Sequence, residues 1–160
     1  MIGIVMEEPS GKEIMDVIKE KLEIKAKIVH TRGKYRLLKK WRFLAYNRLE
    51  NCEKKIVLVD YDNDQDFKSR LEGEVNDEDI MLHFAKQTIE SWLLGCYNVT
   101  NPDNLDNPFK EIKRRFKQEY GAKIKYNKRV DGPKIAKRND LEHFRKSQSF
   151  TEFESKIRDC

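Results

Sequence analysis

The chain has 160 residues, about the length of one domain, and carries 33 Lys and Arg against 28 Asp and Glu, a formal net charge of +5. No apolar run is long enough to cross a membrane, and Gly and Pro are too few for a collagen-like or Pro- and Gly-rich disordered chain. The three cysteines lack the spacing of a zinc site or a disulfide framework, and the apolar first residues lack the basic start of a secretory signal. We therefore expect a reduced, cytoplasmic protein without a membrane segment.

Strands and helices are predicted to alternate in the first part of the chain. The run 56–59 is apolar at every position, which is typical of a strand inside a parallel sheet. The predicted strands are 2–6, 23–30, 55–60 and 80–84, and the predicted helices are 12–22, 34–51, 65–71 and 87–94. This order predicts an α/β fold, a Rossmann-like and mostly parallel sheet with helices on both faces.

The rest of the chain is predicted to be a helical extension. Asn107 and Pro108 form a helix start, and apolar residues at helical spacing follow as far as a stop at Gly121. The pattern elsewhere predicts a loop at 97–107, a short strand at 122–126, loop-like chain around 128–138, and helices at 141–146 and 150–157. We expect a single domain, 1–160, with a core at 1–96 and a C-terminal extension at 97–160.

The charge is unevenly distributed along the chain. Residues 24–49 include nine bases and no acid, residues 60–79 nine acids and two bases, and residues 108–146 fourteen bases and five acids. Two interpretations stay open: an acidic centre flanked by surfaces that attract phosphates, and ordinary solvated helix faces.

Acidic residues follow two of the predicted strands. Glu7 comes directly after the first strand, and Asp60 and Asp62 come at the end of the third. Ligands of an open parallel sheet bind at the carboxyl ends of its strands, and residues two apart in extended chain point the same way. Clustered carboxylates repel one another unless a cation joins them, and oxygen ligands without His or Cys suit Mg²⁺ or Mn²⁺. The alternative is that the Asp residues are turn formers and helix caps.

Two segments together resemble the Toprim domain of topoisomerases, primases, overcoming-lysogenization-defect nucleases and RNase M5-like enzymes. They are Met6-Glu7-Glu8-Pro9-Ser10-Gly11-Lys12 and Val57-Leu58-Val59-Asp60-Tyr61-Asp62. Three further segments of the chain resemble small stand-alone Toprim-like families. They are Ile89-Glu90-Ser91-Trp92-Leu93-Leu94 and, near the C-terminus, 131–136 and 147–153. The resemblance implies that Glu7 is a general acid/base or metal ligand, that Asp60 and Asp62 hold the metal, and that Glu90 is a further acid.

Two positions depart from the Toprim pattern. Glu8 stands where Gly is usual, and Gly11 stands where Asp is common. A carboxylate at position 8 would repel a phosphate that approaches the strand end, which favours a binding module without catalysis.

Other charged residues have two interpretations each. Glu90 lies beside an apolar stripe and is either functional or a half-exposed partner of a nearby base. Lys12, in the Toprim-like motif, and Lys128, Lys134 and Arg138, in loop-like chain, are candidate contacts to substrate phosphates or plain surface charges.

The expected function is Mg²⁺-dependent hydrolysis of phosphodiester bonds in DNA or RNA. The main alternative is a catalytically inactive module that binds nucleic acid or a partner protein of a defence or repair system. A third alternative is a small-molecule phosphohydrolase, since basic loops also suit nucleotides.

Overall fold

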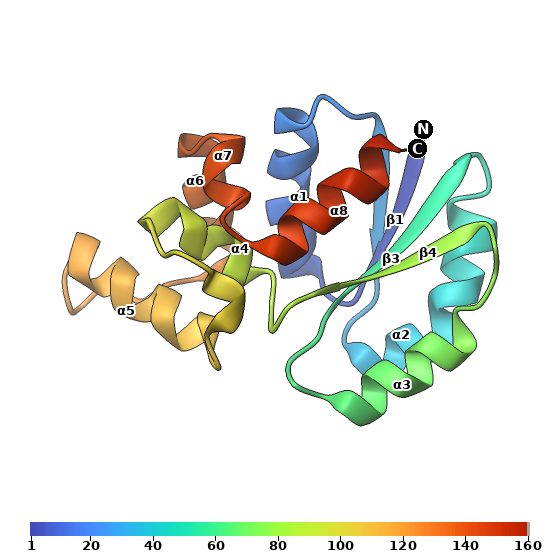
Figure 1. Cartoon of the computed structure of the whole chain (residues 1–160), viewed down its shortest axis with the longest axis horizontal. Coiled ribbons are helices and arrows are strands. Elements are labelled where there is room, and N and C mark those ends of the chain that lie inside the picture. Colours follow the sequence, from blue (N-terminus) through green and yellow to red (C-terminus); the bar gives the residue numbers. More distant parts are fainter. Residues whose placement is uncertain (160) are drawn as a thin grey trace.

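The computed structural model describes residues 1–159 and has a four-stranded sheet at its centre (Figure 1). The strands follow the order β2-β1-β3-β4, and each neighbouring pair is parallel. They are β1 (Ile2–Met6), β2 (Ala26–His30), β3 (Lys54–Asp60) and β4 (Ile80–Ala85). The predicted α/β fold with a parallel, Rossmann-like sheet is confirmed.

Helices cover both faces of the sheet, as Figure 1 shows. On one face, Val5 and Val57 pack under α2 (Lys34–Phe43), the π-helical turn η1 (Leu44–Arg48) and α3 (Gln65–Glu74). On the other face, Ile4 and Ile56 pack under α1 (Pro9–Lys21), α4 (Glu90–Leu94) and α8 (Gln148–Arg158). Side chains of a strand alternate between the faces, so the apolar run of β3 supplies both cores.

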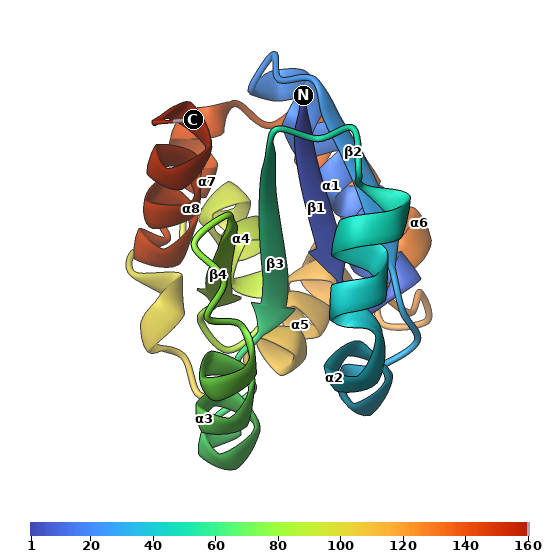
Figure 2. The same cartoon turned by 90° about the vertical axis from the view of Figure 1, so that its right-hand side faces the viewer.

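The C-terminal helices pack around α1 and α4. After the short 3-10 turns η2 (Gly95–Tyr97) and η3 (Pro102–Asn104) come α5 (Pro108–Tyr120), α6 (Lys128–Arg138) and α7 (Leu141–Phe144). Helix α6 lies against α1, where Gly132 comes so near Ile14 that a Cβ would lie 2.8 Å from Ile14 Cδ1. Helix α8 returns to β4 (Figure 2), where Ser149 O lies 2.8 Å from His83 Nε2.

Two expectations for residues 122–138 are wrong. No strand forms at 122–126, and α6 replaces the expected loop-like chain at 128–138. Asn127 caps α6, since its side chain accepts hydrogen bonds from the backbone N–H groups of the second and third residues after it. Gly132 and Pro133 are poor helix formers, but the close approach to α1 requires a residue without a side chain at position 132.

Smaller differences concern element bounds. The helix expected at 34–51 is α-helical to Phe43 and continues as a π-helical turn. The helix expected from residue 12 begins at Pro9, in a position that suits proline because the first N–H of a helix has no intrahelical partner. Within the described part of the chain, no helix combines the length and apolar character that a membrane span requires.

Candidate functional site

Three carboxylates meet at the carboxyl edge of the sheet. Glu7 and Glu8 follow β1, Asp60 ends the adjoining β3, and one oxygen from each lies within 4.8 Å of the others. The predicted approach of Glu7 to Asp60 is therefore present, because β1 and β3 are neighbouring parallel strands. Glu8 takes the third place in this acidic triad, the name used below for Glu7, Glu8 and Asp60.

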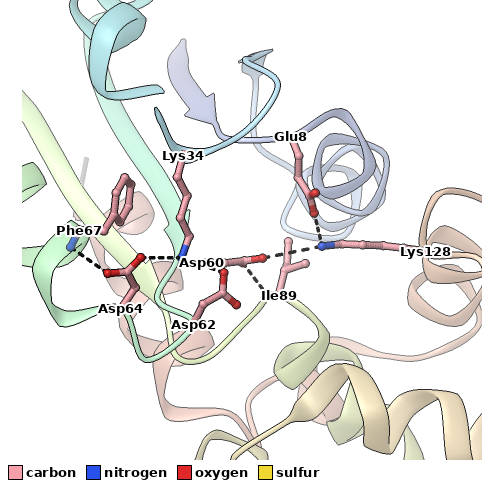
Figure 3. A network of polar contacts seen from close by, with 8 residues as sticks. All are labelled: Glu8, Lys34, Asp60, Asp62, Asp64, Phe67, Ile89 and Lys128. Carbon is pink, nitrogen blue, oxygen red and sulfur yellow. Dashed lines mark hydrogen bonds and ion pairs between the residues drawn. The ribbon is translucent and has the colours of Figure 1, made fainter. Parts of the chain in front are cut away.

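The ammonium of Lys128 lies against this triad, as Figure 3 shows for Glu8 and Asp60. Lys128 is the first residue of α6 and forms an ion pair with Glu8; its Nζ lies 3.7 Å from Asp60 Oδ2 and 3.2 Å from Glu90 Oε1. The Lys128 side chain is 15 % exposed, and although burial opposes the charged form, the three carboxylates raise its pKa. The contact between residues 8 and 128 depends on the packing of α6 against α1.

Burial makes two carboxyl groups of the triad weak acids. The pKa of Asp60 is raised to about 7, mainly by desolvation; Lys128 opposes the shift and Glu90 adds to it. The pKa of Glu7 is raised to about 8 by desolvation and by the negative charges of Asp60 and Asp62. Near neutral pH this edge of the sheet therefore holds protons that exposed carboxylates would have lost.

Two carboxylate oxygens in this cluster are buried and accept no hydrogen bond. They are Glu7 Oε2 and Glu90 Oε1, the second of which has only the ion pair with Lys128. By contrast, Asp60 Oδ1 accepts a hydrogen bond of 2.9 Å from the backbone N–H of Ile89. Buried polar atoms without a hydrogen-bond partner are uncommon in folded proteins, so each calls for an explanation such as a bound ion.

Asp62 lies beside the triad and outside it. The chain leaves the extended conformation after Asp60, since Asp62 has a φ of 50°, so the extended backbone that the expectation for Asp60 and Asp62 assumed is absent. Asp62 Oδ2 instead lies 2.9 Å from Lys34 Nζ (Figure 3). Asp64 also faces Lys34, at 3.9 Å, and caps α3 by accepting from the backbone N–H of Phe67, the role that the turn-and-cap alternative assigns to such residues.

The four candidate phosphate contacts fall in different places. Lys12 pairs with Asp16 on its own helix, Lys134 is exposed on α6, and Arg138 pairs with Glu119 of α5. The fourth candidate, Lys128, forms ion pairs with the triad, which none of the other three does.

Sequence reasoning missed the role of Lys34. This residue starts α2 directly after the loop that follows β2, and so reaches the same edge of the sheet. That loop is hydrogen-bonded to the backbone of Glu7. The Gly33 N–H and the Thr31 hydroxyl donate to the Glu7 carbonyl oxygen, at 2.7 and 3.0 Å. The rule that ligand residues follow parallel strands could have indicated Lys34, because it also follows a strand.

The donor set fits a hard divalent cation. Glu7, Glu8 and Asp60 offer only carboxylate oxygens, the ligands that Mg²⁺ and Mn²⁺ prefer, and one of these oxygens is buried without a partner. Within residues 1–159, the acidic triad is the one group of three or more Asp, Glu, His or Cys side chains that lie close enough together to share an ion.

Comparisons with known proteins give a family and no function. The family model described as "Domain of unknown function (DUF4276)" matches residues 6–158, a stretch that includes every residue of the cluster described above. No curated protein and no solved structure matches the chain. Because the matched stretch covers nearly the whole sequence, the chain belongs to the DUF4276 family.

Proposed function

We propose that the chain is a Toprim-like enzyme that hydrolyses phosphodiester bonds in DNA or RNA with Mg²⁺ or Mn²⁺. The observation that carries the proposal is the acidic triad, with its oxygens within 4.8 Å and Glu7 Oε2 buried without a partner. Lys128 pairs with Glu8 and Asp60, but within residues 1–159 no ion pair involves Glu7, so its ionisation beside Asp60 is unfavourable unless a further cation binds.

Glu7 and Asp60 are the residues proposed to hold the cation. They end adjoining strands, as the Toprim resemblance implies for its glutamate and its first aspartate. A bound Mg²⁺ would supply stabilisation of negative charge on the phosphodiester and lower the pKa of an attacking water. Glu7 has a pKa raised to about 8 in the absence of a cation, so it must lose its proton when it binds one near neutral pH.

Lys128 and Glu90 are proposed to complete the site. The Lys128 ammonium forms an ion pair with Glu8, which offsets the repulsion that Glu8 alone would exert on a phosphate. Glu90 is buried beside the same ammonium at 3.2 Å and positions it. Lys128 is therefore the contact to the substrate phosphate, while Asp62 is occupied by Lys34 at the edge of the site.

A second candidate function is a catalytically inactive binding module. The observation that favours it is the pairing of Lys128 with Glu8, Asp60 and Glu90, which compensates their charge without a metal. A module of this kind would bind nucleic acid, or a partner protein of a defence or repair system, through the surfaces around the sheet edge.

A cleavage assay separates the two functions. End-labelled single- and double-stranded DNA and RNA are incubated with the protein in Mg²⁺, in Mn²⁺ and in EDTA. Asp60→Asn is the test variant, because the amide oxygen still accepts from Ile89 N–H while the charge is removed. Asp106→Asn, at an exposed position, is the matched control.

If the protein is an enzyme, we expect cleavage that requires Mg²⁺ or Mn²⁺, is lost in Asp60→Asn and is retained in Asp106→Asn. Binding without cleavage in any metal would refute the enzyme and favour the module. Circular dichroism spectra of both variants show whether the fold is retained.

A further inference from the structure

We propose that a basic groove beside the triad binds the phosphodiester backbone of a polynucleotide. The groove lies at the carboxyl end of β2, has a volume of about 270 Å³ and is lined by Arg32, Arg36, Lys40 and Arg48, with Phe43 among the other lining residues. It is called the β2 groove below. This inference rests on the proposed function and deepens it, since it states where the chain of the substrate lies.

The charge of the β2 groove is uncompensated. The side chains of Arg32, Arg36, Lys40 and Arg48 are exposed, and within residues 1–159 no carboxylate lies within 4 Å of their charged groups. The basic face of α5 differs, because Glu111 there pairs with two arginines. Cations that share one groove repel one another, and a polyanion relieves that repulsion while it releases its own counterions.

The spacing of the cations suits an extended ligand. Arg36, Lys40 and Arg48 recur at multiples of four residues, so they follow one face of α2 and η1 over a length of about 18 Å at 1.5 Å per residue. A small anion would contact one or two of these groups, whereas a phosphodiester chain presents a charge at each nucleotide. Phe43, which is 54 % exposed, offers an apolar surface on which a base can stack.

At the carboxyl end of β2, the β2 groove adjoins the backbone of Glu7. Arg32 lies between Thr31 and Gly33, and both of these neighbours donate hydrogen bonds to Glu7 O. Lys34, the first residue of α2, reaches Asp62 on the far side. A polynucleotide strand held along α2 would therefore pass close to the end of β1, where the carboxylates lie.

The test is a binding measurement in EDTA, so that no cleavage takes place. Fluorescein-labelled single-stranded DNA and RNA of the same sequence are titrated with the protein at several salt concentrations, and binding is followed by anisotropy. Arg36→Gln/Lys40→Gln is the test variant. Lys39→Gln/Arg42→Gln is the matched control, since it removes the same two charge types from the same helix on the side that faces α3.

If the β2 groove binds the strand, the test variant should bind more weakly than the unaltered protein. The slope of the logarithm of its association constant against the logarithm of salt concentration should be shallower by about 1.4, or about 0.7 for each lost phosphate contact. Equal weakening in both variants would mean a general charge effect and would overturn the proposal, as would the absence of binding by the unaltered protein. If the test variant binds more weakly as expected but the unaltered protein cleaves nothing in the cleavage assay above, the proposed active site is refuted and the β2 groove is not.

Discussion

Replacing Glu7 by Gln tests the electrostatic strain at the carboxyl edge. The amide has nearly the size of the carboxyl group and carries no charge. The pKa of Glu7 is raised from 4.5 to about 8, first by burial and then by Asp60 and Asp62. A group whose folded-state pKa is raised contributes stability in full below its unfolded pKa, and this contribution is lost as the pH rises toward the folded pKa.

The magnitude follows from the size of the shift. Ionising Glu7 in the folded protein costs up to about 5 kcal/mol, the product of roughly 3.5 pH units and 1.36 kcal/mol per unit. This is an upper bound, because Asp60 lies in the same cluster and takes up part of the proton binding. We expect Glu7→Gln to be more stable than the unaltered protein near pH 8 in EDTA, and to lose that advantage near pH 4.5.

Urea unfolding followed by tryptophan fluorescence measures the effect, since Trp41 and Trp92 are both buried. Glu20→Gln, at an exposed position of α1, is the control and should show no such dependence on pH. Added Mg²⁺ should stabilise the unaltered protein, by about 2.7 kcal/mol at a hundredfold excess over the dissociation constant, and stabilise Glu7→Gln less. The difference in free energy of unfolding between Glu7→Gln and the unaltered protein should change between pH 4.5 and pH 8. If it is the same at both, the raised pKa of Glu7 is refuted.

Three further substitutions, followed by urea unfolding, test the charge pairing at the site and the packing of the helices around it. Lys128→Met should cost about 3–5 kcal/mol in EDTA, because three carboxylates lose their buried partner, and Mg²⁺ should restore part of the loss; equal stability would contradict the ion-pair cluster. Gly95→Ala should destabilise by at least about 1–3 kcal/mol, because its Cβ would lie 1.9 Å from His143 O, and an unchanged midpoint would contradict this close approach. Trp92→Phe removes the 2.9 Å hydrogen bond to Ser149 Oγ and should cost about 1–3 kcal/mol, whereas a neutral effect would show that this bond does not hold α8 to α4.

Local signals in the sequence predicted much of the fold. The apolar run of β3 identified a buried parallel strand, and the Asn107-Pro108 pair marked the first residue of α5 correctly. Both signals act within a few residues, through burial on two faces of a strand and through capping of a helix. Such signals do not depend on what the rest of the chain does.

The missed features depend on contacts between distant segments. Helix α6 has poor local propensity, and it forms where Gly132 packs against Ile14. The ion pair of Glu8 with Lys128 joins residues 120 positions apart, so no spacing in the sequence indicates it. At Asp62 the backbone is left-handed and its N–H donates to Gln87 O, a contact between distant segments that ends the extended chain assumed from the sequence.

The most direct test of the proposed metal site is the anomalous diffraction of crystals grown with Mn²⁺. A metal at the triad should give a peak at coordination distance, about 2.1 Å, from oxygens of Glu7 and Asp60, with the Lys128 ammonium moved away from Asp60. A map without a peak at the triad, in which Lys128 still pairs with Glu8 and Glu90, would contradict the proposed metal site.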